Sequence, residues 1–225
     1  MLFRSLTDEQ RIESYFDQLG SGSMFLDAGC GAAALVKVAH RSFHTVVGCD
    51  VAFRWLTLAR KRLQEAGLPV NLICCCGDYL PFPDGLFDTV SAVSLLEHVN
   101  DAGAVVRECA RVTSSGGRTF FLTTNRFSVA PEPHVRLWGV GFLPRRWMPA
   151  YVQWRRGIPY EHKHLLSIFE LRRFLKAAGL DSAKFSLPVI AKVDLEHAGA
   201  LERTGARIFR VLGRVPLVRS LLLAV

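Results

Sequence analysis

Hydrophobic positions follow two alternating patterns along the chain. Short apolar runs bounded by polar or turn residues predict strands; they lie at residues 24–29, 45–50, 70–78, 118–125 and, with a following turn, 87–99. Apolar residues at helical spacing predict helices, at residues 7–19, 32–41, 52–67, 101–117 and 165–180. The segment 101–117 includes a stop at its end, TSSGG, and a further strand is expected at 183–191. This order predicts an α/β fold, a Rossmann-like three-layer α/β/α sandwich with a mostly parallel sheet.

The regular pattern breaks between residues 126 and 165. This segment contains five prolines and three tryptophans, has no clean periodicity and is too long for an ordinary connection. We therefore expect a functional insertion and call residues 126–165 the lid segment. The 225 residues are expected to form a single domain with its core at about 20–190 and a basic amphipathic tail at 199–225.

Composition narrows the environment in which the protein works. A 50% share of hydrophobic residues predicts an ordered globular protein, and a net charge of +8 favours anionic surroundings. Six cysteines without zinc-like spacing indicate buried thiols in a reducing compartment. Neither a signal peptide nor a membrane span is expected from the apolar runs. We predict a cytoplasmic protein that can lie at the inner membrane face.

The first predicted strand leads into a glycine loop, "FLDAGCGAAALVKVA". It fits G-x-G-x-x-G/A of dinucleotide sites, and it fits D-x-G-x-G-x-G with Ala33 in the last glycine position. Asp50 ends the second strand 19 residues beyond Gly31, where a carboxylate can accept from ribose hydroxyls. Asp78 follows the third strand, where it can accept from an adenine amino group. These positions predict an adenosine site without choosing the cofactor.

Four segments decide between the two patterns: "FLDAGCG", "VVGCDVAF", "GDYLPFPDGLFDTVSAVSLLEHV" and "RECARVTSSGGRTFFLTTNR". In this order they resemble class I S-adenosylmethionine (SAM) dependent methyltransferases, in particular the ubiquinone/menaquinone C-methylase-like and small-molecule O-methyltransferase branch with the type 11 methyltransferase domain. The resemblance covers about residues 24–126 and implies SAM as cofactor. The cofactor-binding residues that it implies are Asp27, Ala28, Gly29, Gly31, Asp50, Val51, Phe53, Asp78 and Tyr79. Ala33 departs from the family pattern and leaves the packing of the loop open. A dehydrogenase would need a further substrate domain, which makes that alternative the weaker one.

Methyl transfer needs alignment and, for a weak nucleophile, removal of a proton. Glu97 and His98 end the fourth strand, and His98 is a candidate general base. Alternatively, both residues only shape the cofactor pocket. Substrate-binding candidates come from the lid segment and its flank: Asn125, Arg126, His134, Arg136, Tyr160, His162 and His164. Glu132 with His134, His162 and His164 lacks a strong metal-ligand spacing, so no metal is expected.

Five aromatic residues and five arginines, without an acidic residue after Glu132, fill the middle of the lid segment. Such a mixture suits an amphiphilic substrate or an anionic headgroup layer. The alternative is an ordinary lid with aromatic residues packed on the core. The expected acceptor is a small molecule or a lipid-like one, by O- or C-methylation. A non-catalytic SAM-binding regulator and an RNA methyltransferase remain alternatives, although "SLLEHV" at the strand end makes nucleic acid the weaker partner.

Overall fold

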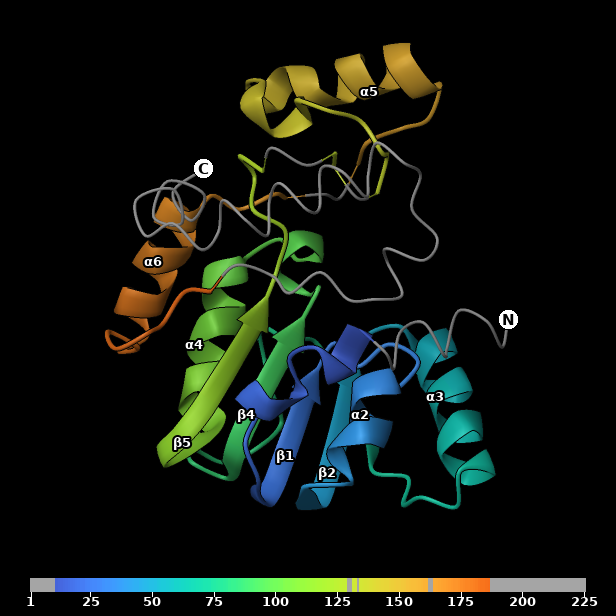
Figure 1. Ribbon diagram of the computed structural model, residues 1–225, viewed down its shortest axis with the longest axis vertical. Helices are drawn as coiled ribbons and strands as arrows, with labels where there is room; N and C mark the ends of the chain where they lie inside the picture. The colour runs from blue at the N-terminus through green and yellow to red at the C-terminus, as the bar shows by residue number, and fades with distance from the viewer. Residues whose placement is uncertain (1–10, 129–130, 133, 162–163, 187–225) are drawn as a thin grey trace.

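The computed structural model describes residues 11–128, 131–132, 134–161 and 164–186, and all structural features given below belong to these residues (Figure 1). Their sheet has the strand order β3-β2-β1-β4-β5, and every pairing is parallel. Its strands are β1 (Gly22–Ala28), β2 (Phe43–Asp50), β3 (Leu72–Cys74), β4 (Phe87–Val93) and β5 (Thr113–Leu122). The predicted Rossmann-like fold is therefore confirmed.

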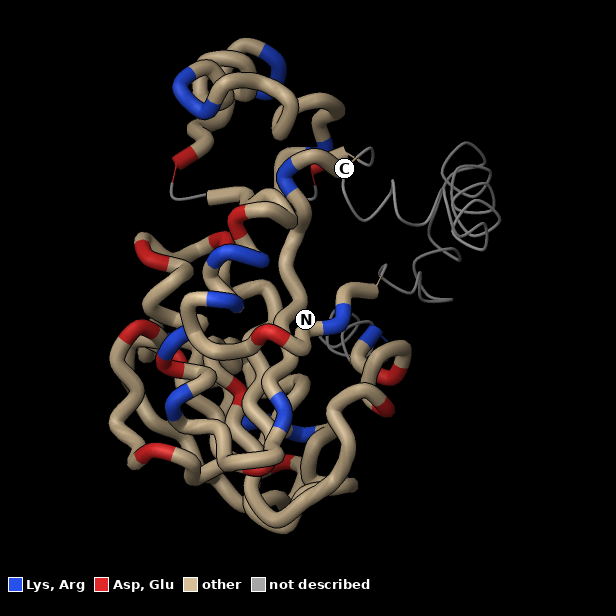
Figure 2. Tube along the Cα trace, turned by 90° about the vertical axis from the view of Figure 1, so that its left-hand side faces the viewer, with Lys and Arg blue, Asp and Glu red and all other residues tan. Residues whose placement is uncertain are grey.

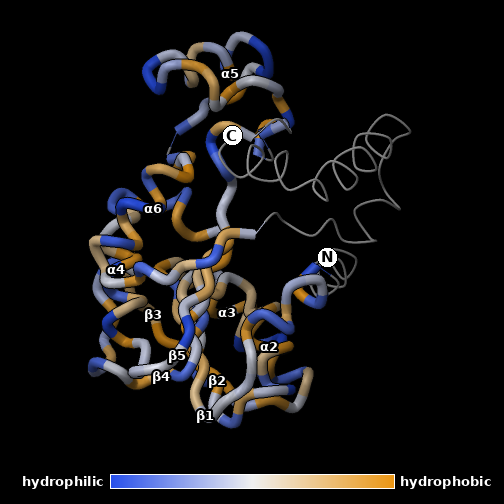
Figure 3. The backbone as a smooth tube through the Cα atoms, turned by 60° about the vertical axis from the view of Figure 1, so that its left-hand side comes forward, coloured by the Kyte–Doolittle hydropathy of each residue, from blue (hydrophilic) through white to orange (hydrophobic). Residues whose placement is uncertain are grey.

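Helices cover both faces of this sheet, as Figure 3 shows from the side. One face carries α2 (Ala34–Ala39) and α3 (Phe53–Glu65), and the other carries α4 (Ala102–Val112). A further helix, α6 (Ile168–Ala177), packs on α4. Short 3₁₀ helices are η1 (Phe16–Gln18) and η2 (Leu96–His98). The three layers thus leave the carboxyl ends of the strands accessible from one edge of the sheet.

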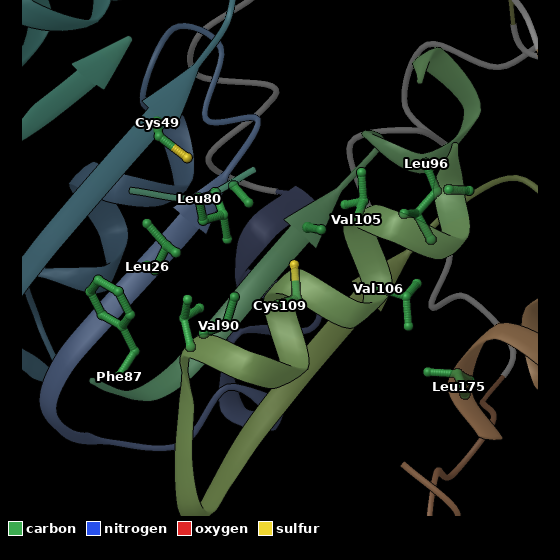
Figure 4. Close-up of a cluster of buried hydrophobic side chains, with 14 of the residues drawn as sticks. Leu26, Cys49, Leu80, Phe87, Val90, Leu96, Val105, Val106, Cys109 and Leu175 are labelled. Atoms are coloured by element: carbon green, nitrogen blue, oxygen red, sulfur yellow. The ribbon is translucent and has the colours of Figure 1, made fainter. Parts of the chain in front are cut away.

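The core divides into two clusters because side chains alternate across a strand. Phe25 of β1 packs with α2 and α3, whereas its neighbour Leu26 faces α4. Figure 4 shows the second cluster, in which Val105 and Cys109 of α4 lie against β4. Each fully buried aliphatic or aromatic side chain contributes about 1.5–3 kcal/mol. Both clusters hold the strands rigidly beneath the loops at their carboxyl ends.

Local sequence signals fix where two of the helices begin. The side chain of Asp101 accepts from the backbone N–H of Ala104 (2.8 Å) and caps α4. Ser167 and Glu170 form a reciprocal capping box at α6. These caps explain why α4 and α6 start within three residues of the predicted boundaries.

The predicted helix stop after residue 112 is confirmed, but β5 begins at Thr113, five residues before the predicted strand start at 118. The register between β4 and β5 shifts between Phe87 and Thr89, which accommodates extra residues in β5. Gly116 has a φ of +78°, and a Cβ on Gly117 would lie 2.8 Å from the carbonyl oxygen of Asp88. The two glycines therefore form an irregular part of the strand and do not end a helix.

Two predictions at the ends of the described chain are also corrected. Residues 11–13 are helical, but the helix does not continue to Leu19, and η1 replaces its last turn. The hydroxyl of Ser14 donates to the carbonyl of Arg11 (2.6 Å), a local hydrogen bond that competes with helix continuation. Residues 183–186 form no strand, and 187–191 lie outside the described residues.

The lid segment lies beyond the carboxyl ends of the strands (Figure 1). It contains η3 (Val140–Phe142), η4 (Arg145–Trp147) and α5 (Met148–Arg156). A small apolar core of its own includes Val140, Met148, Val152 and Tyr160. The lid segment is therefore a packed layer, and its position limits the space beyond the carboxyl ends of the strands. None of the described helices is long and apolar enough to cross a membrane.

Candidate functional site

The central strands β1 and β4 are adjacent, although β2, β3 and two helices separate them in sequence. Open parallel sheets bind ligands at such a switch point, beyond the carboxyl ends of the strands. The loops that follow β1, β2 and β4 meet here, and they carry most of the residues predicted from the sequence. This edge of the sheet is the candidate active site.

The glycine loop turns sharply after β1. Gly29 and Gly31 have φ angles of +77° and +50°, and the backbone N–H groups of Gly29 and Cys30 donate to the carbonyl of Cys49 (2.8 and 2.9 Å). A Cβ on Gly29 would lie 2.9 Å from Leu95, so this position has room only for glycine. Ala33 adopts a left-handed φ of 62° in the buried last position of the motif. The loop thus adopts a left-handed backbone at an alanine, at an expected cost of about 1–2 kcal/mol.

Asp50 links two segments of the site. Its Oδ2 accepts from the N–H of Gly31 (2.9 Å) and its Oδ1 accepts from the N–H of Ala52 (2.8 Å). A carboxylate offers about four acceptor positions, so about two remain for ribose hydroxyls. Asp50 is therefore suited to hold the glycine loop and a ribose together.

Asp27 is the buried carboxyl group of the site, with 3% of its surface exposed. Burial raises the pKa of Asp27 from 3.8 to about 7; the hydrogen bond from Ser91 opposes this rise, and the charge of Asp50 adds to it. The Ser91 hydroxyl on β4 donates to Oδ1 of Asp27 (2.7 Å). A cationic ligand group beside Asp27 would favour its charged form. The sequence pattern gave Ser91 no role; the available signal was its place between the apolar residues Val90 and Ala92 of β4.

Three apolar or aromatic side chains that follow β2 and β3 are unusually exposed. Val51, Phe53 and Tyr79 are 65%, 73% and 79% exposed. Asp78 is also exposed beside Tyr79. Exposed apolar side chains that cluster at a strand end mark binding surfaces. Their contact with an adenine, with Asp78 as an acceptor, stays a prediction from the family resemblance.

The end of β4 brings the predicted catalytic residues to the same edge. Ser94 has a left-handed φ of 52°, which turns the chain into η2. Glu97 is 1% exposed and accepts from the hydroxyl of Thr123 at the end of β5 (2.8 Å). The backbone carbonyl of Glu97 accepts from the N–H of His164 (2.9 Å). Glu97 thus anchors η2 to β5 and to the lid segment, while His98 is exposed at the surface of the site.

His134 of the lid segment contacts η2 at the end of β4. The rings of His98 and His134 meet edge to face, with centroids 5.2 Å apart. One side-chain donor or acceptor atom from each of Glu97, His98 and His134 lies within 4.8 Å of the others. Nδ1 of His134 lies 2.5 Å from Oε1 of Glu132, which is buried. The expectation that no metal is needed stays a prediction.

The other lid candidates have different surroundings. Arg126 donates to the carbonyls of Gly141 (2.9 Å) and Leu143 (3.0 Å), and a Cβ on Gly141 would lie 1.6 Å from the Arg126 carbonyl oxygen. Arg126 therefore fastens the lid segment, and Asn125 lies beside it in a cavity of about 10 Å³, enough for one water. Arg136 is exposed, while Tyr160 packs in the lid core. His162 lies outside the described residues, and the substrate roles of this set stay predictions.

Comparison with known proteins agrees with this geometry. A family model described as "Methyltransferase domain" matches residues 26–121. A ubiquinone biosynthesis O-methyltransferase of Idiomarina loihiensis is 31% identical over 171 residues, which cover 76% of this chain and 66% of the relative. Residues 26–121 belong to this methyltransferase domain family. A second relative with the same name, from Thiobacillus denitrificans, is 38% identical over 107 residues, or 47% of this chain and 46% of the relative.

Solved structures show the same fold. The YcgJ protein of Bacillus subtilis has a TM-score of 0.59 at 20% identity and covers 94% of this chain and 86% of its own. A geranyl diphosphate methyltransferase in complex with SAM has a TM-score of 0.55 at 20% identity, with 77% and 64% coverage. The chain spans between about half and two thirds of the length of the curated relatives given above.

SAM is the cofactor of this methyltransferase chain, and the described residues fit it. Gly29 and Gly31 take left-handed φ angles in the glycine loop, Asp27 lies two residues before Gly29, and Phe53 at the start of α3 and Tyr79 after β3 expose their rings. When bound, SAM supplies an electrophilic methyl group. The roles of the single residues toward SAM stay predictions from the family resemblance.

Proposed function

We propose that this methyltransferase chain transfers a methyl group from SAM to a small, lipid-like acceptor and releases S-adenosylhomocysteine (SAH). The observation that carries this proposal is the convergence of the SAM loop, the β4 end and a basic, aromatic lid segment at one edge of the sheet. Relatives named ubiquinone biosynthesis O-methyltransferases favour a hydroxyl group on the acceptor.

The outer surface of the lid segment supports a lipid-like acceptor. Four of its aromatic side chains are more than half exposed: Trp138, Phe142, Trp147 and Trp154. The guanidinium groups of Arg146 and Arg155 each lie 5.4 Å from a tryptophan ring centroid. Figure 2 shows lysine and arginine positions gathered along this part of the lid. Aromatic rings paired with arginines suit the interface between water and an anionic headgroup layer.

We extend the proposal to the place where the enzyme works. It acts in the cytoplasm and binds the inner membrane face peripherally through the lid segment and the tail at residues 199–225. Basic residues near an anionic surface contribute about 1 kcal/mol each, so several of them are needed for stable binding. The acceptor would then be taken from the layer to which the lid segment binds.

Two measurements on the full chain test the methyl transfer. SAM and SAH are first titrated by calorimetry, and SAH release is then followed with catechol, an alkylcatechol and an alkylquinol as acceptors. We expect binding of both cofactor forms and faster turnover of the alkylated acceptors. SAM binding without turnover on any acceptor would favour a non-catalytic SAM-binding protein. Absence of SAM binding would contradict both functions.

Sedimentation with vesicles tests the membrane contact separately. We expect the chain to sediment with phosphatidylglycerol vesicles and to stay in solution with phosphatidylcholine vesicles. Trp147→Ser with Trp154→Ser should weaken sedimentation. The matched control is Trp55→Ser on α3, because Trp55 is 40% exposed and also lies near an arginine, Arg54. Equal loss in both variants would contradict a specific lid surface.

A further inference from the structure

We infer that His134 of the lid segment takes the proton from a hydroxyl acceptor, with Glu132 as its positioning residue. The inference rests on the proposed O-methylation, because a hydroxyl oxygen is a weak nucleophile until its proton is removed. It assigns the proton acceptor to the lid segment, whereas the sequence pattern pointed to His98 at the end of β4.

The contact between Glu132 and His134 fixes the orientation of the imidazole. Nδ1 of His134 lies 2.5 Å from Oε1 of Glu132. A carboxylate only accepts hydrogen bonds, so Nδ1 carries the hydrogen in this contact, and in the neutral imidazole Nε2 is then the acceptor. The His134 side chain is 26% exposed, so Nε2 can meet a ligand without a large movement of the ring. A carboxylate that holds one imidazole nitrogen while the other takes a proton is the arrangement of known catalytic histidines.

Glu132 is itself held firmly. Its side chain is 3% exposed, and Oε2 accepts from the N–H of Val135 (2.8 Å). Its backbone pairs with Leu137 across a tight reversal, in which the N–H of Arg136 donates to the Glu132 carbonyl (2.7 Å). A buried carboxylate on a closed turn can fix the imidazole ring, which an exposed and mobile carboxylate could not do. Glu132 therefore acts through His134 and does not need to reach the acceptor.

A second observation points to a polar ligand at this place. The hydroxyl of Tyr160 is buried and has no hydrogen-bond partner in the described residues. Burial, together with the charge of Glu132, raises the pKa of Tyr160 well above its usual range, so the hydroxyl keeps its hydrogen. Unpaired buried hydroxyl groups are rare, because leaving one unpaired costs about 1–3 kcal/mol. A polar acceptor molecule or a water beside Glu132 and His134 would provide the missing hydrogen-bond partner of the Tyr160 hydroxyl.

The position of His134 matches the place where the proton must be removed. Its ring touches that of His98 edge to face, and side-chain polar atoms of Glu97, His98 and His134 lie within 4.8 Å of one another. This point lies beyond the end of β4, and Leu95, the residue before η2, is the nearest side chain to a Cβ built on Gly29 of the glycine loop. An acceptor beneath the lid segment would place its hydroxyl between His134 and the cofactor.

The proposed step balances as follows. The O–H bond of the acceptor breaks, its proton moves to Nε2 of His134, and the oxygen lone pair forms the new bond to the methyl carbon. The electron pair of the broken carbon–sulfur bond remains on the sulfur of SAH. The imidazolium that forms faces the Glu132 carboxylate, which stabilises its positive charge. Release of that proton to water through the exposed ring edge returns His134 to its starting form.

Kinetics of the full chain with the alkylcatechol test the catalytic role. His134→Ala should lower kcat by at least about a hundredfold. Its KM and the SAH affinity measured by calorimetry should change much less, and added imidazole should restore part of kcat. Glu132→Gln should lower kcat by about tenfold, because it keeps the ring without fixing its orientation. His44→Ala, an exposed histidine at the start of β2, is the matched control and should keep kcat.

NMR of ¹⁵N-histidine-labelled protein without cofactor gives a readout that does not depend on activity. We expect the wild type to show His134 as the single tautomer with hydrogen on Nδ1, and Glu132→Gln to lose that preference. An unchanged tautomer in Glu132→Gln would overturn the positioning role. Active wild type with a kcat of His134→Ala within about threefold, or wild-type activity abolished by EDTA, would overturn the proton-acceptor role. Wild type that binds SAH but turns over no acceptor would instead count against the proposed function.

Discussion

Replacing Asp50 tests whether one carboxylate both organises the glycine loop and binds the cofactor. In Asp50→Ala, the N–H groups of Gly31 and Ala52 lose acceptors at 2.9 and 2.8 Å. A hydrogen bond to a charged group contributes about 1.5–3 kcal/mol when buried. Asp50 is only half-buried, so we discount the two bonds to about 2 kcal/mol together. For a chain of this size the loss should lower Tm by roughly 6 °C.

The same variant should bind SAH at least about tenfold more weakly, because the ribose hydroxyls also lose a charged acceptor. Asp50→Asn should fall between wild type and alanine, since its amide keeps one acceptor oxygen but turns an NH₂ group toward a loop N–H. Differential scanning calorimetry and isothermal titration measure the two effects, with the exposed Asp181→Asn as control. A weaker SAH affinity with an unchanged Tm would refute the loop-organising role, and no change in either value would refute the whole assignment.

Three further predictions use other parts of the molecule. Because folding raises the pKa of Asp27 to about 7, the folded state holds a proton that the unfolded state has already released above about pH 4, so the free energy of unfolding should fall between about pH 4 and 7 by up to about 1.4 kcal/mol per pH unit. Urea unfolding of Asp27→Asn should lack this pH dependence, and the same dependence in both proteins would contradict the burial argument. Ser94→Val should lower the free energy of unfolding by about 1–2 kcal/mol, because a β-branched residue tolerates the left-handed φ of 52° poorly, whereas Ser94→Gly should not lower it. Thermal unfolding of the two variants measures the difference, and equal effects would argue against backbone strain. Removal of residues 199–225, which lie outside the described residues, should abolish sedimentation with anionic vesicles and leave SAM affinity intact; retained sedimentation would contradict a role of the tail.

The order of helices and strands was predictable because it depends on local periodicity. The strands β1, β2 and β4 each contain a run of four consecutive buried residues, as expected for strands of a parallel sheet that is covered on both faces. The extent of β5 was not predictable from its own residues. Its start at Thr113 depends on the register shift against β4 and on the close approach of Gly117 to Asp88, which are contacts between strands.

The placement of Asp27 and Asp50 in the fold was predictable to the same degree. Asp27 and Asp50 lie at or next to the ends of neighbouring parallel strands, so topology alone brings them together. The lid segment was less predictable, since the spacing of Glu132 and His134 suggested only a shared strand face. The contact between Glu132 and His134 depends on a chain reversal from Glu132 to Leu137, in which Arg136 has a left-handed backbone. Glycine usually marks such a position in a sequence, and here the residue is an arginine.

One measurement tests the central claim directly. The full chain is incubated with SAM that carries a deuterated methyl group and with the alkylcatechol, and the products are analysed by mass spectrometry. The account predicts an acceptor that gains the deuterated methyl group on oxygen, together with an equal amount of SAH. SAM that remains intact after saturating the protein, with every acceptor unmodified, would contradict the claim that this fold transfers a methyl group.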